Sequence, residues 1–298
     1  MLPRLLLFSV LLLAQSAHAT LNVLACEPEW ASLTQELAGD LARVTSATTA
    51  KQDPHHIEAR PSLIARARNA DLLVCTGAEL EVGWLPLLQR ESGNGRIQPG
   101  RAGYFEAAAQ VRLLEKSGLA DRAQGDVHPG GNPHIHADPR TLLKVANALA
   151  PRLAELDAAN ADVYAARNQA FQKRMGAAIK RWEMEAAPLR GVPVVVHHKS
   201  WSYLADWLGL RVVADLEPKP GIEPSVASLA ALLERLKTQP AKLVLRTPYQ
   251  SAKPSEWLAA RAGIAVVELP YTVGGSTAAV DLFGVFEESV AKLRSVVK

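Results

Sequence analysis

The sequence has little excess charge of either sign. It contains 33 Lys and Arg against 30 Asp and Glu, which gives a formal net charge of +3. The basic residues are also spread among acidic ones, as Arg60, Arg66 and Arg68 are near Glu58 and Asp71. Binding to nucleic acid needs clustered Lys and Arg that face the phosphates. The composition therefore argues against a nucleic-acid partner.

Long apolar runs are missing after the first residues. Residues 1–19 carry Arg4, the apolar run Leu5 to Leu13 and then Ala17-His18-Ala19, which is the order of a signal peptide with a small-x-small cleavage site. No later stretch reaches the roughly 20 apolar residues that a membrane-spanning helix needs. We expect cleavage after Ala19, and a mature protein in the periplasm that has no membrane anchor.

Cysteine is scarce, with only Cys26 and Cys75 in the chain. An even number of cysteines in an exported protein favours a disulfide. Each cysteine ends an apolar, strand-like run, Leu21 to Cys26 and Asp71 to Cys75, and neighbouring parallel strands would bring these ends together. We predict a Cys26–Cys75 bridge. Two buried thiols are the alternative, and lipid attachment at Cys26 is less favoured because this residue lies inside an expected strand.

No internal repeat or low-complexity tract interrupts the remaining chain, in which hydrophobic residues make up 48% of the composition. Short apolar runs alternate with amphipathic stretches in both halves, which predicts βαβ units and parallel sheets. The expected strands are Leu21 to Cys26, Arg43 to Thr48, Leu72 to Thr76, Val192 to Val196, Val212 to Asp215, Leu243 to Leu245 and Ala265 to Leu269. The expected helices between and after them are Trp30 to Leu41, Pro61 to Asn69, Trp201 to Leu208, Ser225 to Lys237, Ser255 to Ala262 and Asp281 to Val297.

The middle of the chain has a different pattern. A helix is expected from Asp138-Pro139 to about Leu156, and Ala158 to Ala187 continues without proline or strand periodicity. A helix of about 30 residues would be about 45 Å long, which suits a spine between two lobes. We predict an N-terminal α/β lobe over 20–155, a linking helix over 156–188 and a C-terminal α/β lobe over 189–298.

The histidines are confined to few places. His18 belongs to the expected signal peptide, and the other seven of the eight form three clusters. These are His55 and His56; His128, His134 and His136; and His197 and His198. Imidazole is the commonest side-chain metal ligand, and in a parallel α/β lobe ligands bind at the loops that leave the carboxyl ends of strands. Since the clusters fall in such loops, we predict one metal site assembled from distant segments.

The segments around these histidines resemble signature segments of a known family. In order along the chain they are Asp53-Pro54-His55 with Glu58 and Pro61; Asn132-Pro133-His134 with Asp138-Pro139; Val195-Val196-His197-His198 with Tyr203-Leu204; and Glu217-Pro218 with Gly221 and Glu223-Pro224-Ser225. They resemble the zinc- and manganese-specific solute-binding proteins of bacterial ABC importers, the cluster A-I family. The resemblance covers essentially the whole mature chain. It implies a periplasmic protein that captures a metal between two lobes and is no enzyme.

The resemblance also implies a set of metal ligands. The first three motifs place them at His55, His134 and His198, and the fourth, an acidic residue at the start of the last helix, falls on Asp281. Three imidazoles and one carboxylate suit Zn²⁺, whereas manganese sites favour more oxygen ligands. Zn²⁺ is therefore the expected cargo, not a catalytic cofactor, and a manganese-specific protein of the same family is the alternative.

Other polar residues near the motifs have auxiliary roles to consider. Glu58 could accept a proton from a ligand imidazole or cap the following helix, and Glu223 could brace the crevice. His136 is favoured as a packing or supporting residue. His128 stands in a short loop that could transfer metal or could simply be solvated. These are expectations to be compared with the structure.

The expected partners follow from the resemblance. They are an ABC permease of the inner membrane with its cytoplasmic ATPase, and a periplasmic metallochaperone is a further candidate, with the binding protein itself a monomer. A secreted zinc hydrolase is the main rival, but the chain has neither an H-E-x-x-H nor a G-x-S-x-G motif. A periplasmic metal buffer or an adhesin of the same architecture stays open.

Overall fold

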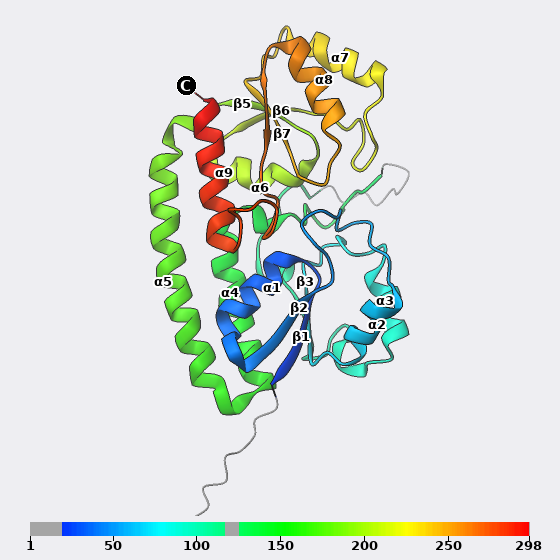
Figure 1. Ribbon diagram of the computed structural model, residues 1–298, viewed down its shortest axis with the longest axis vertical. Helices are drawn as coiled ribbons and strands as arrows, with labels where there is room; N and C mark the ends of the chain where they lie inside the picture. The colour runs from blue at the N-terminus through cyan, green and yellow to red at the C-terminus, as the bar shows by residue number, and fades with distance from the viewer. Residues whose placement is uncertain (1–19, 117–124, 298) are drawn as a thin grey trace, which may run out of the picture.

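The computed structural model describes residues 20–116 and 125–297. The expected signal peptide, residues 1–19, lies outside the described residues. Two four-stranded sheets, one in each half of the chain, form the centres of two lobes that are stacked along the long axis of the molecule (Figure 1). All strand pairs in both sheets are parallel. The two-lobe α/β architecture expected from the sequence is confirmed.

The two sheets repeat one strand order. The first runs β2-β1-β3-β4 and the second β6-β5-β7-β8. The strands are β1 (Leu21–Ala25), β2 (Ala42–Ser46), β3 (Leu72–Cys75), β4 (Tyr104–Glu106), β5 (Pro193–Val196), β6 (Arg211–Asp215), β7 (Leu243–Arg246) and β8 (Ala265–Glu268). β4 has no counterpart among the expected strands. Its three residues are too few to produce a recognisable periodicity.

Helices cover both faces of each sheet. They are α1 (Pro28–Ala38), α2 (Pro61–Arg68), α3 (Leu85–Ser92), α4 (Pro139–Leu156), α6 (Ser202–Leu208), α7 (Val226–Leu236), α8 (Ala252–Ala262) and α9 (Leu282–Val296). Their ends follow local chemistry. α4 begins where the Asp138 side chain accepts a hydrogen bond from the Arg140 amide, and α6 ends at Gly209 in the left-handed conformation. α3 was not expected from the sequence.

The linking helix is α5 (Ala161–Glu185), with 25 residues. It is shorter than the expected Ala158 to Ala187 because 3₁₀ turns replace its ends, Ala158–Asn160 and Ala187–Leu189. Figure 1 shows it running along one side of the molecule past both lobes. It packs against α1 and α4 of the first lobe and α9 of the second. The helix therefore braces both lobes and does not act as a free tether.

One hydrophobic core extends through both lobes. It joins side chains of the first sheet, such as Val23 and Val74, with Trp182 on α5 and with Val194 and Leu245 of the second sheet. A smaller cluster beneath α2 and α3 covers the other face of the first sheet, and a third cluster beneath α7 and α8 covers that of the second. Because the largest core is shared, we infer that the lobes are not independent folding units.

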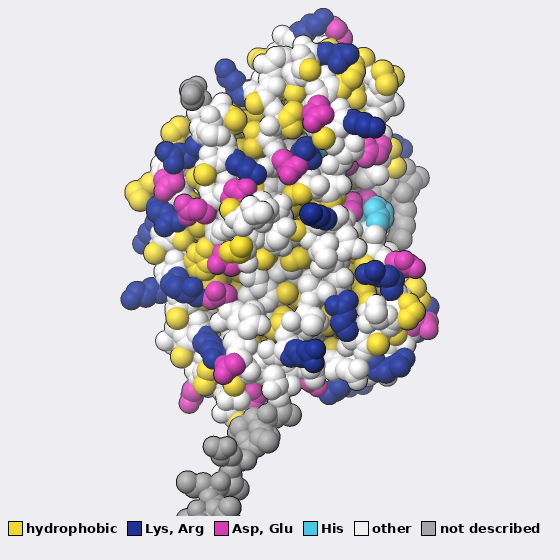
Figure 2. Space-filling model, viewed as in Figure 1, with side chains coloured by type: hydrophobic (Ala, Val, Ile, Leu, Met, Phe, Trp, Pro, Cys, Tyr) yellow, Lys and Arg dark blue, Asp and Glu magenta, His cyan; other side chains and the backbone are white. Residues whose placement is uncertain are grey.

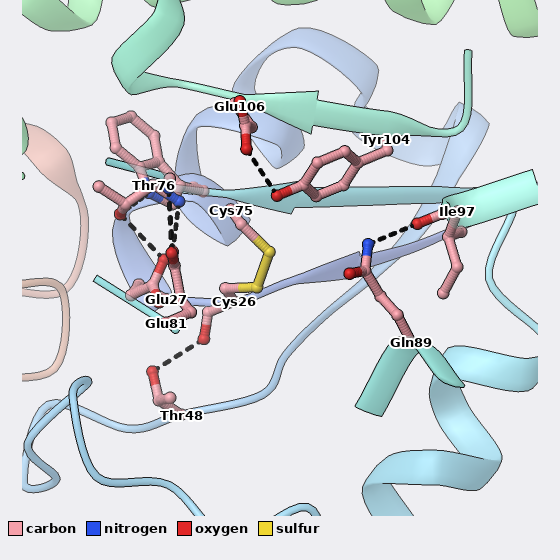
Figure 3. The surroundings of a disulfide bond; sticks show 12 residues. Cys26, Glu27, Thr48, Cys75, Thr76, Glu81, Gln89, Ile97, Tyr104 and Glu106 are labelled. Atoms are coloured by element: carbon pink, nitrogen blue, oxygen red, sulfur yellow. Dashed lines mark hydrogen bonds between the residues drawn. A yellow bond between two sulfur atoms is a disulfide. The ribbon is translucent and has the colours of Figure 1, made fainter. Parts of the chain in front are cut away.

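The predicted Cys26–Cys75 disulfide is present. Cys26 directly follows β1 and Cys75 ends β3, and these two strands are paired in parallel (Figure 3). Both residues are fully buried. The Thr48 hydroxyl donates a 2.9 Å hydrogen bond to the Cys26 carbonyl, so the end of the next strand is joined to the same edge. The bridge fixes the carboxyl edge of the first sheet.

Charged side chains of both signs are present on the face of the molecule shown in Figure 2. On the face in Figure 2, Lys and Arg side chains alternate with Asp and Glu. This mixture agrees with the small formal net charge of the sequence. Within the described residues, no helix is both long enough and apolar enough to cross a membrane.

Candidate metal centre

Three histidines from three distant loops meet between the lobes. His55 lies between β2 and α2, His134 between β4 and α4, and His198 shortly after β5. Each offers a ring nitrogen, and these atoms all lie within 4.8 Å of one another. The ring centroids are 5.3 to 5.5 Å apart. Because all three loops leave carboxyl ends of strands, the cluster occupies the crevice where α/β folds bind ligands.

We call these three residues the imidazole cluster. Their exposed fractions are 6% for His55, 1% for His134 and 5% for His198. The Nδ1 atom of His55 is 2.6 Å from Asp53 Oδ1, and that of His198 is 2.6 Å from Glu217 Oε2. An ionised carboxylate can only accept, so each Nδ1 carries a proton, and Nε2 is the ring nitrogen left to bind a metal.

His134 has a different partner. Its Nδ1 lies 2.8 Å from the Tyr271 hydroxyl, which comes from the loop after β8 in the other lobe. Its Nε2 is buried and has no hydrogen-bond partner among the described residues. A buried nitrogen without a partner is costly unless something else binds it. This atom therefore marks the side of the cluster where a cation would be held.

Burial and charge interactions together set the protonation of the histidines in the cluster. Burial, followed by repulsion from the His55, His198 and His128 imidazoles, lowers the pKa of His134 well below its usual value. Burial acts in the same direction on His198, but the hydrogen bond to Glu217 and the negative charges of Glu217, Asp53 and Asp126 together outweigh it and raise the pKa. A neutral His134 is ready to coordinate a metal, whereas a metal at His198 must compete with a proton.

Local structure holds the two carboxylates in place. Asp53 Oδ1 also accepts a 3.0 Å hydrogen bond from the His55 amide, which forms a tight turn around the histidine. Burial raises the pKa of Asp53, but its hydrogen bonds with His55 and its charge interactions with His55 and His198 together lower the pKa to about 2, so this side chain is ionised. Glu217 Oε2 accepts a 2.7 Å hydrogen bond from the Gly221 amide. Both carboxylates are thus oriented before any metal arrives.

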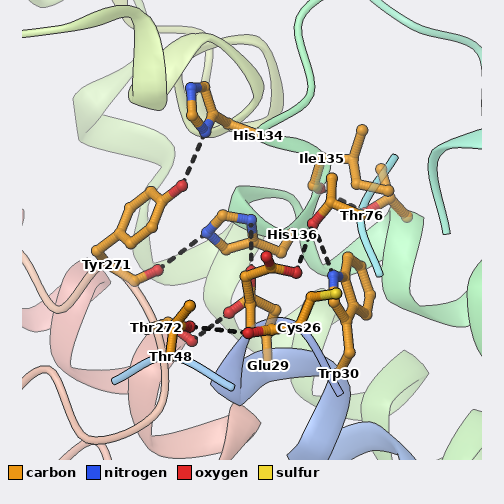
Figure 4. A network of polar contacts seen from close by, with 12 residues as sticks. Cys26, Glu29, Trp30, Thr48, Thr76, His134, Ile135, His136, Tyr271 and Thr272 are labelled. Atoms are coloured by element: carbon orange, nitrogen blue, oxygen red, sulfur yellow. Dashed lines mark hydrogen bonds and ion pairs between the residues drawn. The ribbon is translucent and has the colours of Figure 1, made fainter. Parts of the chain in front are cut away.

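A second polar network lies behind His134 and connects the lobes (Figure 4). His136 Nε2 is 3.2 Å from the Tyr271 carbonyl oxygen, and its Nδ1 is 3.1 Å from Glu29 Oε1 on α1. Glu29 in turn accepts a 2.5 Å hydrogen bond from the Thr272 hydroxyl. His136 therefore lies in a network that joins α1 of the first lobe to the loop after β8. The loop after β8 contacts both His134 and His136 of the first lobe.

Asp281 is not brought to the imidazole cluster. Its Oδ1 accepts a 2.8 Å hydrogen bond from the Gly284 amide and caps α9. It lines a separate cavity with residues of α1 and β2, including Ala31 and Val44. The position of Asp281 does not support its expected role as fourth ligand, because the loop after β8 presents Tyr271 to the histidines instead.

The acidic residues near the motifs differ in exposure and in hydrogen bonding. Glu58 and Glu223, for which auxiliary roles were expected, are both exposed. Asp53 and Glu217 are the acidic residues that accept hydrogen bonds from His55 and His198. Asp53 could have been noticed, because an acid two residues before His55 is a common turn pattern. Tyr271 gives no such signal, since its partner is 137 residues away.

His128 lies close to the imidazole cluster. Its Nε2 is 3.2 Å from His55 Nε2, and its ring centroid is 6.3 Å from that of His134. It lines a cavity of about 140 Å³ together with His134 and His198. Burial, with repulsion from His55 and His198, lowers the pKa of His128 to about 3.

The remaining histidines point elsewhere. His56 is exposed and its Nε2 lies 3.2 Å from Asp126 Oδ2. His197 is buried, burial lowers its pKa to about 4, and its Nδ1 has no partner among the described residues. Both are neighbours of cluster residues and not members of it. The alternation of consecutive side chains in extended chain accounts for this.

One other group of potential ligands lies close together, Cys26, Cys75 and Glu81. The two sulfurs are joined in the disulfide and are not free to bind a metal. Glu81 accepts hydrogen bonds from the Thr76 and Gly77 amides. Within the described part of the chain, the imidazole cluster is therefore the better candidate for a metal centre.

Comparison with known proteins agrees with this geometry. The family described as zinc-uptake complex component A, periplasmic, matches residues 23–296. The chain belongs to this family. Among members of the zinc-uptake family and their relatives, the zinc-binding lipoprotein AdcA of Streptococcus pneumoniae is 26% identical over 75% of this chain, but the match covers only 44% of AdcA.

Relatives of this chain carry names that refer to either metal. The high-affinity zinc uptake system protein ZnuA of Bacillus subtilis is 24% identical, with 77% of this chain and 72% of that protein covered. The crystal structure of a ZnuA superimposes with a TM-score of 0.73 at 25% identity, covering 92% of this chain and 100% of that one. The solute-binding protein FpvC of Pseudomonas aeruginosa, in complex with Mn²⁺, gives 0.77 at 25% identity, with 94% and 99% covered.

Proposed function

We propose that this protein captures Zn²⁺ between its two lobes in the periplasm and delivers it to the permease of an ABC importer. His55 and His134 would bind the ion from the first lobe and His198 from the second. The observation that carries the proposal is the convergence of three buried imidazoles, of which His134 Nε2 has no partner. The protein would act as a binding protein and not as an enzyme, with the metal as cargo.

The donor set favours zinc over manganese. Imidazole nitrogen suits Zn²⁺ in tetrahedral sites, whereas Mn²⁺ is held better by carboxylate and carbonyl oxygens. Near the cluster, Asp53 and Glu217 are engaged by the Nδ1 atoms of His55 and His198 and act as their hydrogen-bond acceptors. Because relatives include both zinc and manganese proteins, this preference rests on the chemistry of these side chains and not on the fold.

Metal analysis tests the choice of metal directly. Protein purified from the periplasm is expected to contain about one equivalent of zinc. In a competition experiment with both ions, Zn²⁺ should displace Mn²⁺. Stoichiometric manganese that zinc fails to displace would instead favour the manganese-specific alternative.

Replacement of adjacent histidines tests the ligand assignment. His198→Ala removes a proposed ligand, so the zinc dissociation constant measured by chelator competition should rise by more than about 100-fold, the upper end of the effect of an outer-shell partner. His197→Ala is the matched control, because His197 is equally buried but lies outside the cluster. It should cost stability and leave zinc affinity close to that of the parent. Equal zinc affinities for parent and His198→Ala would exclude this site.

A further inference from the structure

Two buried acids lie beside the disulfide of the first lobe (Figure 3). Glu27 directly follows Cys26, Glu81 belongs to the turn after β3, and each is 1% exposed. Thr76 joins them, because its hydroxyl donates a 3.1 Å hydrogen bond to Glu27 Oε2 and its amide donates a 2.6 Å hydrogen bond to Glu81 Oε1. Glu27 Oε1 is buried and has no hydrogen-bond partner among the described residues. Two buried carboxyl groups side by side are costly unless a proton or a cation compensates their charge.

The surroundings of this carboxyl pair oppose its ionisation. Burial, followed by repulsion from Glu81 and Glu29, raises the pKa of Glu27 well above its usual value. Burial also raises the pKa of Glu81 to about 7, although hydrogen bonds from backbone amides act in the opposite direction. A proton shared between the two carboxyl groups is the ordinary way to reduce this cost. A bound cation is the other way, and it needs further ligand atoms nearby.

The sulfurs of Cys26 and Cys75 are such atoms. Each sulfur and one carboxylate oxygen of Glu81 lie within 4.8 Å of one another, and all three residues are buried. While the sulfurs are joined in the disulfide they cannot bind a metal. Two thiolates bound to one tetrahedral zinc at about 2.3 Å would be about 3.8 Å apart. Sulfurs released from a disulfide start about 2.0 Å apart, so rotation about a Cα–Cβ bond can supply the difference.

We propose that opening of the Cys26–Cys75 bridge creates a second zinc site, in which both thiolates and Glu81 bind the ion and Glu27 takes the fourth position. A thiol reductant opens the bridge by supplying two electrons. The S–S bond breaks, two protein thiols form, and the reductant becomes a disulfide. Zinc binding then releases the two thiol protons to water and leaves a thiolate-rich set that suits Zn²⁺.

This second site would replace the disulfide as the link at the carboxyl edge of the first sheet. The zinc ion would join the ends of β1 and β3, the paired strands that the bridge joins when the sulfurs are oxidised. It would also compensate the charge of the buried carboxyl pair, which the disulfide leaves uncompensated. The site shares no residue with the imidazole cluster, so this inference does not depend on the proposed function.

Cobalt binding to the full mature chain tests the inference, because Co²⁺ can stand in for Zn²⁺ and its charge-transfer absorption with thiolates identifies bound sulfur. The oxidised protein should bind one equivalent of Co²⁺ without this absorption. Protein reduced with a phosphine, which adds no thiol of its own, should bind two equivalents, show the absorption and lose it when Zn²⁺ is added. Reduced protein without thiolate absorption would overturn the inference and keep the proposed function. Oxidised protein that binds no metal would contradict the proposed function alone.

Two variants of the reduced protein test the role of Glu81. Glu81→Gln keeps the size of the side chain and removes the charge. The affinity of the thiolate site for Zn²⁺, measured by displacement of Co²⁺, should fall at least about tenfold, since even outer-shell partners of a metal site are worth that much. Glu91→Gln is the control, because it makes the same change at an exposed residue of α3. Equal affinities of the two variants would refute Glu81 as a ligand.

Discussion

Glu217 controls both the orientation and the basicity of His198. Its Oε2 accepts from His198 Nδ1 and from the Gly221 amide, so one oxygen fixes the ring and the turn together. The negative charge also favours the protonated imidazole, in opposition to burial. A carboxylate in this position strengthens the metal ligand but makes it more sensitive to acid.

The acid sensitivity of zinc binding should therefore depend on Glu217. A raised pKa means that a proton competes with zinc for His198 Nε2 at higher pH, so affinity is lost as pH falls through that pKa. Glu217→Gln keeps an acceptor oxygen but removes the charge, and should shift this loss to lower pH. Chelator competition from pH 7.5 to 5 measures the shift. A parent-like pH profile for Glu217→Gln would show that Glu217 does not set the pKa of His198.

Single residues were predicted from the sequence with uneven success. His55, His134 and His198 could be singled out, because histidine is rare in this chain and each stands in a recognisable motif. Glu58 was considered for the role that Asp53 has, since spacing along the chain does not say which carboxylate faces the ring. Tyr271 could not be chosen at all, because only the packing of the lobes brings its hydroxyl to His134.

At the scale of elements, the start of α9 shows why an acidic residue in this position is ambiguous. An acidic residue before a helix has two uses, because it can bind a metal or accept hydrogen bonds from the free amides of the first turn. Asp281 has the second use. The sequence pattern is the same for both, and only the direction of the side chain separates them.

The capping role of Asp281 gives a prediction for stability. Asp281→Ala should lower the free energy of unfolding by about 1 kcal/mol, as loss of an N-cap usually does. Urea unfolding of the metal-free protein measures this. Zinc affinity should stay at the parental value. Ser225→Ala, which removes the N-cap of α7, is a control for the loss of a cap elsewhere. A large loss of zinc affinity in Asp281→Ala alone would return Asp281 to the ligand set.

At the scale of the whole molecule, α5 and the shared core limit how the lobes can move. α5 packs against α1, α4 and α9, and Trp182 on α5 is fully buried within the core that joins the two sheets. Wide hinge closure would have to separate these contacts, which is expensive in a close-packed interior. Small shifts of the loops around the imidazole cluster are a less costly way to admit and release a metal.

Small-angle X-ray scattering tests this expectation. The radius of gyration of the full mature chain should be the same, within experimental error, with and without one equivalent of zinc. The loops that carry His55 and His198 should nevertheless become more protected from hydrogen exchange when zinc binds, because the metal would then hold both imidazoles. A clear decrease in the radius of gyration on zinc binding would mean that the lobes close as rigid bodies about a hinge.

The sequence alone determined the class of fold, the approximate elements, the disulfide between Cys26 and Cys75 and the three histidine loops. These features follow from local composition, from periodicity and from residues that are rare in the chain. Tertiary structure alone decided which side chains meet: Asp53 with His55, Tyr271 with His134, and Glu217 with His198. The physical reason is that such contacts depend on the direction of side chains and on the packing of two distant sheets, and neither leaves a periodic trace in the sequence.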